Sequence, residues 1–185
     1  GDGDGGFTEV NAGLAGVTRG SSALGDVNGD GNEDLVITGY DGNDRTTTLY
    51  LGDGSGGFTE ANGRLTGVRR GSSSLGDVDG DGNLDLVVTG EDSDNNQIAT
   101  AYLGDGDGGF TEMSAGLTGV SRSSSALGDV DNDEDLDLVI TGSLDDSNTD
   151  NDGNLSTLYL GDGAGGVRFR KEVRRRVGRR ADRDP

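Results

Sequence analysis

The sequence predicts an all-β fold, a β-propeller of four-stranded blades with about three blades in this chain. The first observation is a threefold repeat, because Phe-Thr-Glu recurs at Phe7, Phe58 and Phe110, at steps of 51 and 52 residues. The second is that each repeat holds short β-branched or apolar runs separated by Gly-Asp-Gly turns, which is typical of strands and hairpins. A period near 50 residues that is built from short strands indicates propeller blades rather than a helical solenoid.

Each repeat is predicted to contain four strands, which we name A to D in chain order. Strand A is rich in Ser, Ala and Gly, and such small side chains suit an innermost strand that is crowded around an axis. Strand B is a β-branched run of the kind found in buried strands. The copies of strand A are 22–27, 73–78 and 125–130, and those of strand B are 35–38, 86–89 and 138–141.

Strand C ends in Tyr-Leu-Gly, and a Gly-Asp-Gly turn that tolerates positive φ then reverses the chain. Strand D is the Phe-Thr-Glu segment and is expected to lie outermost. The copies of strand C are 47–51, 98–103 and 156–160, and those of strand D begin at Phe7, Phe58 and Phe110. In chain order this gives a lone strand D, two complete blades and a final unit of strands A to C, which makes twelve strands.

Three blades are fewer than the usual four to eight of a propeller. The N-terminal strand D could complete a blade that has only strands A to C, and this leaves two hypotheses open. In one, two chains form a closed six-bladed homodimer in which each strand D completes the last blade of the other chain. In the other, the sequence is a fragment of a longer propeller, as its start within a repeat suggests.

The stretch 75–90, LGDVDGDGNLDLVVTG, joins a run of oxygen ligands to an apolar strand. Asp77, Asp79 and Asp81 stand at alternate positions, Gly82 allows a sharp turn, and Asp85 closes the run. A hard cation such as Ca²⁺ takes about six to eight oxygens at about 2.3 to 2.6 Å, which flexible carboxylates and a carbonyl can supply. An EF-hand closes with Glu near position 12 before a helix, whereas here Asp closes at position 9 before a strand. The sequence therefore predicts a calcium loop between two strands.

These motifs, with LGDVNGDGNEDLVITG in the first repeat and LGDGDGGF after the second strand C, resemble the FG-GAP repeats, also called VCBS-type or integrin α-like repeats. The resemblance covers nearly all of residues 1–166. It implies a β-propeller with Ca²⁺ bound between strands A and B of each blade, at a cell surface or in a secreted protein. It also implies a role in adhesion or in binding protein or glycan ligands, and some members accompany polysaccharide-degrading modules.

Carried over to this sequence, the resemblance assigns five ligand positions to each loop. They are Asp26, Asn28, Asp30, the Asn32 carbonyl and Asp34; Asp77, Asp79, Asp81, the Asn83 carbonyl and Asp85; and Asp129, Asp131, Asp133, the Asp135 carbonyl and Asp137. The first loop has one carboxylate fewer than the second, so we expect the second to bind more tightly. In the third loop Glu134 replaces the turn glycine, where a positive φ is costly for a side chain, so this site is expected to be the weakest. The alternative is that Asp, Asn and Gly only make tight turns here.

The charge of the chain selects its partners. With 35 acidic and 15 basic residues the net charge is −20, which argues against binding to nucleic acid or to an anionic membrane. No run near 18 apolar residues and no signal peptide is present, so membrane insertion is not expected. A single lysine beside fourteen arginines resembles halophilic proteins, and a calcium-rich extracellular matrix is the competing interpretation.

The charge changes sign near the C-terminus, and this divides the chain into 1–166, with three repeats, and 167–185. The first part has 32 acidic and 6 basic residues, whereas the second has 3 and 9. The second part is expected to be a basic tail, partly disordered, although Val167 and Phe169 could alternate as a strand D.

The sequence does not predict an enzyme. No His or Cys is present, so the usual general bases and nucleophilic dyads are missing, and the acidic clusters are already assigned to metal loops. The first functional hypothesis is a Ca²⁺-binding scaffold for extracellular adhesion or ligand binding, with partners on the variable loops between strands B and C. The alternatives are a carbohydrate-binding or polysaccharide-processing module, for which the loops offer only Tyr40 as an aromatic platform, and a purely structural propeller fragment.

Overall fold

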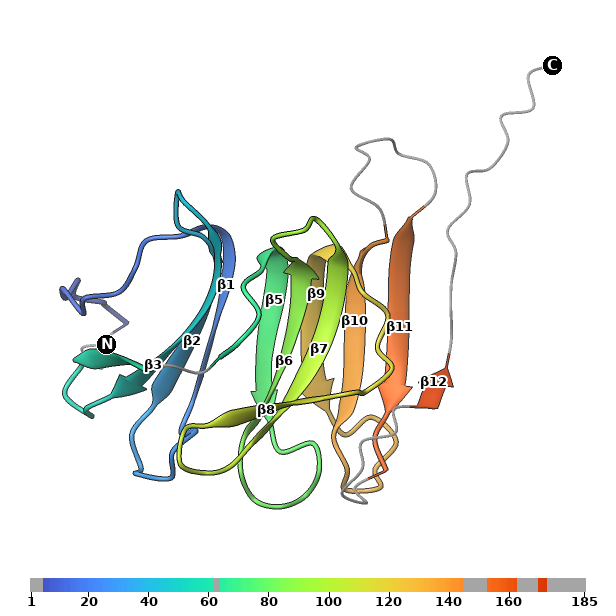
Figure 1. Ribbon diagram of the computed structural model, residues 1–185. Coiled ribbons are helices and arrows are strands. Elements are labelled where there is room, and N and C mark those ends of the chain that lie inside the picture. The colour runs from blue at the N-terminus through green and yellow to red at the C-terminus, as the bar shows by residue number, and fades with distance from the viewer. Residues whose placement is uncertain (1–4, 62–63, 145–152, 163–169, 173–185) are drawn as a thin grey trace.

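The computed structural model describes residues 5–61, 64–144, 153–162 and 170–172. Its strands form three four-stranded antiparallel sheets that stand side by side, and the described residues contain no helix (Figure 1). We call the sheets blades 1, 2 and 3. Blade 1 contains β1 (Thr18–Gly25), β2 (Asp34–Tyr40), β3 (Arg45–Gly52) and β4 (Phe58–Ala61); blade 2 contains β5 (Arg69–Gly76), β6 (Asp85–Glu91), β7 (Gln97–Gly104) and β8 (Phe110–Met113); blade 3 contains β9 (Ser121–Gly128), β10 (Asp137–Ser143), β11 (Asn154–Leu160) and β12 (Arg170–Glu172). The predicted all-β fold of four-stranded blades is confirmed.

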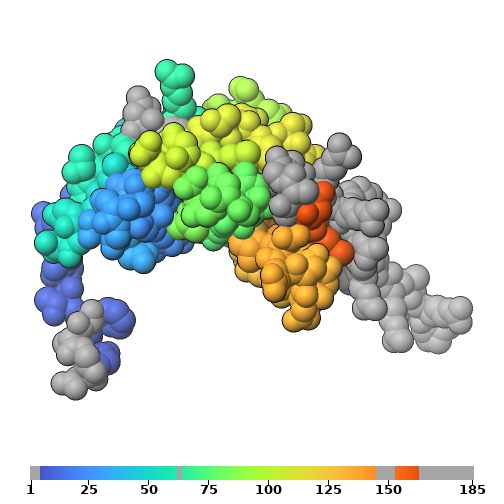
Figure 2. All heavy atoms as spheres, turned by 90° about the horizontal axis from the view of Figure 1, so that it is seen from below, coloured from blue at the N-terminus to red at the C-terminus, as the bar shows by residue number. Residues whose placement is uncertain are grey.

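Within each blade the strands follow one another in chain order from the inner to the outer edge. The β-branched strands β2, β6 and β10 lie between two neighbours, and a side chain such as Leu86 stands between Leu75 of β5 and Tyr102 of β7. The strands rich in serine and glycine, β1, β5 and β9, lie next to one another along the inner side. The three blades therefore form an arc that is hollow on one side (Figure 2).

The core lies between the blades. One cluster joins Val27, Val36 and Leu49 of blade 1 to Leu86 and Val88 of blade 2. A second cluster joins Val87 and Ala101 of blade 2 to a group in blade 3, namely Leu138, Ile140, Leu155 and Tyr159. Because each fully buried aliphatic side chain contributes roughly 1.5–3 kcal/mol, a blade is stabilised mainly by the neighbour that covers its face.

The tyrosine of the Tyr-Leu-Gly motif holds the segment that leads into its blade. The Tyr50 hydroxyl accepts the backbone N–H of Ala15 at 3.2 Å. The same bond recurs from Thr66 to Tyr102 at 3.1 Å and from Thr118 to Tyr159 at 3.0 Å. These bonds fix the path of the chain from one blade to the next.

The outer strands differ from the sequence prediction at both ends of the chain. Phe7-Thr8-Glu9 is not in a strand, and the Phe7 side chain is exposed. Its counterparts β4 and β8 each pair with the strand C that precedes them, whereas the described chain has no strand before Phe7. Beside β11, the place foreseen for an N-terminal strand of another chain, stands β12 of the same chain. It falls within the segment predicted as a tail, and residues 167–169 and 173–185 of that segment lie outside the described residues.

Candidate metal centre

The three loops between strands A and B, at 26–33, 77–84 and 129–136, lie at the same end of the blades (Figure 1). Seen from that end, they stand in a row along the arc in blue, green and orange (Figure 2). We call them loops 1, 2 and 3. All predicted ligand residues are in these loops or at the first residue of the strand that follows.

The first aspartate of each loop folds the loop around its own carboxylate. In loop 2, Asp77 accepts the N–H of Gly80 at 2.7 Å and that of Gly82 at 2.9 Å. In loop 1, Asp26 accepts the N–H groups of Asp30 and Gly31 at 3.2 and 2.9 Å. Gly80 and Gly82 have φ of 75° and 93°, a region that a residue without a side chain adopts freely.

The closing aspartates Asp34, Asp85 and Asp137 are buried and connect two loops. In blade 2, Asp85 Oδ2 accepts the N–H of Val78 at 2.8 Å, and its Oδ1 accepts that of Gly104 at 2.9 Å. Blades 1 and 3 repeat these bonds, from Val27 and Gly52 to Asp34 and from Val130 and Gly161 to Asp137, at 2.7–2.9 Å. Each closing aspartate therefore ties its metal loop to the end of strand C.

Carboxylate oxygens converge in two of the loops. Oxygens of Asp77, Asp79 and Asp85 lie within 4.8 Å of one another, and those of Asp129, Asp131 and Asp137 do the same. Ligands on opposite sides of a calcium ion are about 4.6–5.2 Å apart when each bond is about 2.3–2.6 Å long. Both groups therefore fit one hard cation. Loop 1 carries Asn28 at the corresponding middle position, between Asp26 and Asp34.

The other predicted ligands take part in turns inside the loops. Asp81 accepts the backbone N–H of Asn83 at 2.8 Å and its side-chain amide at 3.0 Å. The corresponding backbone bonds run from Asn32 to Asp30 at 2.8 Å and from Asp135 to Asp133 at 3.1 Å. These residues stand beside the converging carboxylates in sequence, and their role as ligands remains a prediction.

Loop 3 keeps the shape of the others without its glycines. Asn132 and Glu134 have φ of 64° and 76°. Both residues therefore adopt the left-handed backbone conformation, which the sequence predicted at the position of Glu134. The Glu134 N–H still donates to Asp129, at 3.2 Å. The loop thus gathers its carboxylates at the cost of backbone strain of about 1–2 kcal/mol for such a residue.

Several loop carboxylates resist ionisation. Burial raises the pKa of Asp85, the N–H groups of Gly104 and Val78 lower it, and the charges of Asp79 and Asp77 raise it further, so that the net direction is upward. In loop 3, loss of hydration followed by the charges of Asp133 and Asp137 raises the pKa of Asp131. Mutual repulsion among like charges is the condition that a bound cation relieves.

Sequence reasoning did not foresee the second role of the closing aspartates or the buried state of Glu91. The glycine of Tyr-Leu-Gly was a signal for the first, because it follows the closing aspartate in every repeat and donates its N–H to it. Glu91 falls between the predicted strands B and C, where a variable loop was expected, but it ends β6 and is fully buried against arginines. The sequence Asp150-Asn151-Asp152-Gly153 resembles the start of a metal loop but lacks a closing acid, which predicts a turn; its first three residues lie outside the described residues.

Comparison with known proteins places the chain. No curated protein matches it. In the part of the chain that the structure describes, no helix is long and apolar enough to cross a membrane. The family model for the FG-GAP-like repeat matches twice, at residues 26–88 and 77–140, which together span more than half of the 185 residues. Each match begins at one metal loop and ends within strand B of the next blade. The chain therefore belongs to the FG-GAP-like repeat family.

Proposed function

We propose that this chain is a Ca²⁺-binding propeller scaffold for extracellular adhesion or ligand binding. The observation that carries the metal part is the convergence of carboxylates in loops 2 and 3. Asp77, Asp79 and Asp85 would hold one ion, and Asp129, Asp131 and Asp137 would hold another. A bound cation would neutralise carboxylates that now repel one another and would stabilise the loops, and the proposal assigns no catalytic group.

The ligand part of the proposal concerns the hairpins between strands B and C. They lie at the end of the blades opposite the metal loops (Figure 1), so a partner could bind there without displacing metal. Polar side chains shape them, since Asp41 accepts the N–H groups of Asn43 and Asp44, and Asp92 accepts those of Asp94 and Asn96. Such rigid, variable hairpins on a repeated scaffold are a common way to present a binding surface.

Calorimetric titration of the EDTA-treated chain with CaCl₂ tests the metal part. We expect at least two binding events and a rise in Tm, because a ligand at 100 times its Kd stabilises the folded state by about 2.7 kcal/mol. Asp79→Asn should remove one event and should not lower the Tm in EDTA, because it removes a charge that repels Asp85. Asp85→Asn should also lower the Tm in EDTA, because an amide cannot accept both the Val78 and Gly104 N–H groups. The metal proposal would be contradicted if adding calcium produced no heat of binding and no change in Tm.

Binding to immobilised glycans and to extracellular-matrix proteins, measured in calcium and in EDTA, tests the ligand part. Calcium-dependent binding that is lost when the 41–44 and 92–96 hairpins are replaced by Gly-Ser linkers is the expected result. Calcium binding without any partner on either surface would leave the chain as a structural unit and would overturn the adhesion part alone.

A further inference from the structure

One blade-to-blade contact occurs twice within the chain, and its two halves are left uncovered at the ends of the arc. In the contact, small residues on the inner strand of one blade receive larger side chains from the inner strand of the next blade and from the metal loop that follows that strand. A side chain at Gly76 would lie 2.8 Å from Leu136 and 2.9 Å from Leu127 of blade 3. Gly25 is covered in the same way by Leu75 and Leu84 of blade 2.

The third copy of this glycine has no such cover among the described residues. Within that part of the chain, no atom lies within 4 Å of a side chain placed at Gly128, and its φ needs no glycine. Two valines on the same side are exposed although their counterparts in blade 1 are covered: Val130 is 53% exposed where Val27 is 2%, and Val139 is 36% exposed where Val36 is 0%. We call the surface formed by Ser124, Ala126, Gly128, Val130 and Val139 the trailing face.

Blade 1 presents the matching half. Leu24, the counterpart of the covering residues Leu75 and Leu127, is 60% exposed. A side chain at Gly16 would meet none of the described atoms within 4 Å, whereas one at its counterparts Gly67 and Gly119 would collide with the carbonyls of Arg45 and Gln97 in the preceding blade. We call the surface formed by Gly16, Ser22 and Leu24 the leading face. Glu33 stands where the later blades have Leu84 and Leu136, so the contact there is polar.

Serines set the register of the contact. The Ser73 N–H donates to Ser21 Oγ at 3.3 Å between blades 1 and 2, and the Ser125 N–H donates to Ser72 Oγ at 3.2 Å between blades 2 and 3. Continued by one step, the same pattern brings Ser22 of a leading face onto Ser124 of a trailing face. Both are exposed in the chain.

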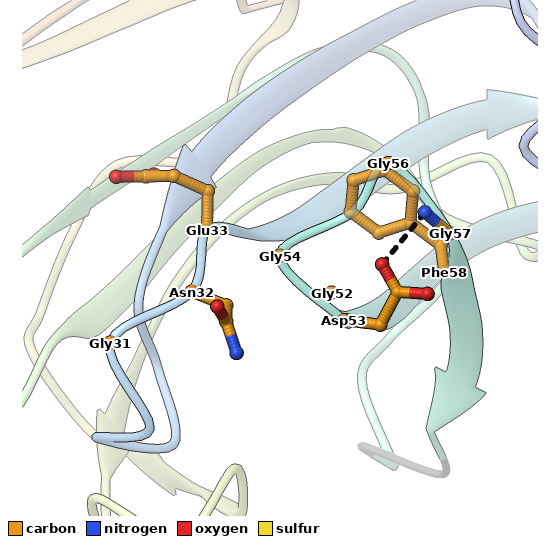
Figure 3. A pocket seen from close by; sticks show the side chains of 9 residues that line it. All are labelled: Gly31, Asn32, Glu33, Gly52, Asp53, Gly54, Gly56, Gly57 and Phe58. Carbon is orange, nitrogen blue, oxygen red and sulfur yellow. Dashed lines mark hydrogen bonds between the residues drawn. The ribbon is translucent and has the colours of Figure 1, made fainter.

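The metal loops take part as well. Loop 1 lies on the turn after strand C of blade 2, where a side chain at Gly108 would be 3.6 Å from Asn28 and one at Gly29 would be 3.5 Å from the Gly106 carbonyl. The same turn in blade 1 borders a cavity of about 380 Å³, with Gly54, Gly56 and the Phe58 ring in its wall. Figure 3 shows the cavity between this turn, closed by the bond from Gly57 to Asp53, and Asn32 of loop 1. It is the place that the metal loop of a preceding blade would take.

We infer that a second copy of this chain covers these faces, the trailing face of each copy packing on the leading face of the other. Two such contacts are equivalent by a two-fold axis and close a ring of six blades. The contact joins faces of blades and exchanges no strand, since β12 already holds the outer edge of blade 3. Apart from Glu33 it is apolar and serine-rich, and each copy carries a net charge of −20, so added salt should strengthen it by screening repulsion.

Light scattering and sedimentation of the whole chain in CaCl₂ and 0.5 M NaCl test the inference. The expected mass is twice 18.8 kDa, with a larger monomer fraction in 0.05 M NaCl. Leu24→Glu, Gly16→Val and Gly128→Leu should each give a folded monomer, because all three sites face open space within one chain. Leu144→Glu is the matched control: Leu144 is exposed, and its blade 1 counterpart Asp41 is exposed although blade 1 has a following blade.

Mixing Leu24→Glu with Gly128→Leu separates a lost contact from a lost fold. The mixed dimer keeps one intact contact, so it should form at a higher concentration than the wild-type dimer, whereas neither variant alone should dimerise. A wild-type monomer at 100 µM chain in high salt would overturn the inference. A dimer that survives both substitutions, or a mass that grows beyond two copies with concentration, would overturn it as well.

Discussion

At the scale of single residues, loop 3 separates the ligand pattern from the backbone that presents it. Asp129, Asp131 and Asp137 converge as in loop 2, although Glu134 occupies the glycine position with φ of 76°. The carboxylate pattern therefore determines which oxygens meet, and the glycine determines how much strain the meeting costs. The affinity of loop 3 for a cation should for this reason be limited by the strain of its backbone more than by the number of its ligands.

Glu134→Gly relieves this strain. The left-handed conformation costs about 1–2 kcal/mol for a residue with a side chain. Glycine avoids this cost, but it also raises the conformational entropy of the unfolded chain, which cancels part of the stabilisation. We expect the free energy of unfolding in EDTA to rise by about 0.5–1 kcal/mol, measured by urea denaturation. Glu134→Gln is the control, since it removes the charge and keeps the strain. An equal gain in both variants would show that charge, and not backbone conformation, limits the loop.

At the scale of elements, blades 1 and 2 are joined by a cluster of charged side chains that does not recur in the repeats. Glu91 at the end of β6 is fully buried and binds Arg45 of β3 at 2.6 Å, Arg69 of β5 at 2.6 Å and Arg70 of β5 at 3.1 Å. The corresponding residue in blade 1 is Tyr40 and in blade 3 is Ser143. The cluster therefore belongs to this one contact between blades.

Glu91→Ala should be strongly destabilising, because it leaves the buried guanidinium of Arg45 without its carboxylate, and Arg45 Nη1 has no hydrogen-bond partner among the described residues. Removing one partner of a buried ion pair costs about 3–5 kcal/mol. Chemical denaturation in calcium measures the loss. The double variant Glu91→Leu with Arg45→Met should recover part of it, and a double variant as unstable as Glu91→Ala would show that packing, and not the unpaired charge, is responsible.

The metal loops and the Glu91 cluster together show what the sequence could and could not predict. The blades and loops 1 to 3 follow from residues a few positions apart that recur three times, such as Asp77, Asp79 and Asp85. Glu91 meets Arg45 only because two sheets pack together, and nothing repeats to reveal it. The ends fail for a related reason: Phe7 has the sequence of a strand but no strand to pair with, whereas Arg170–Glu172 lacks the motif and pairs with β11.

At the scale of the whole molecule, acidic side chains act in two opposite ways. Three aspartates of the metal loops oppose the folded state without a cation, because their pKa values are raised: burial acts first at Asp85, and loss of hydration acts first at Asp131 and Asp135. Those in the turns favour it, because backbone N–H groups, from Ser55 to Asp53 and from Asp107 to Asp105, lower their pKa values. Stability should therefore depend on pH in a direction that calcium reverses.

In EDTA, we expect the Tm to rise as the pH falls from 7.5 toward about 4. A carboxyl whose folded pKa is raised holds its proton more tightly in the folded chain, so its contribution is lost as the pH rises through that pKa and is complete below the ordinary value of 3.8. Below 3.8 the Tm should fall, because Asp53 and Asp105 then gain protons and lose their stabilising bonds. In saturating calcium the dependence on pH above pH 4 should reverse, so that the Tm falls as the pH falls, since protons compete with the metal for the same carboxylates. Differential scanning calorimetry from pH 3 to 7.5 measures both curves, and Asp131→Asn should flatten the EDTA curve above pH 4. A Tm in EDTA that is highest at pH 7.5 would mean that repulsion among the loop carboxylates does not control the stability of the metal-free chain.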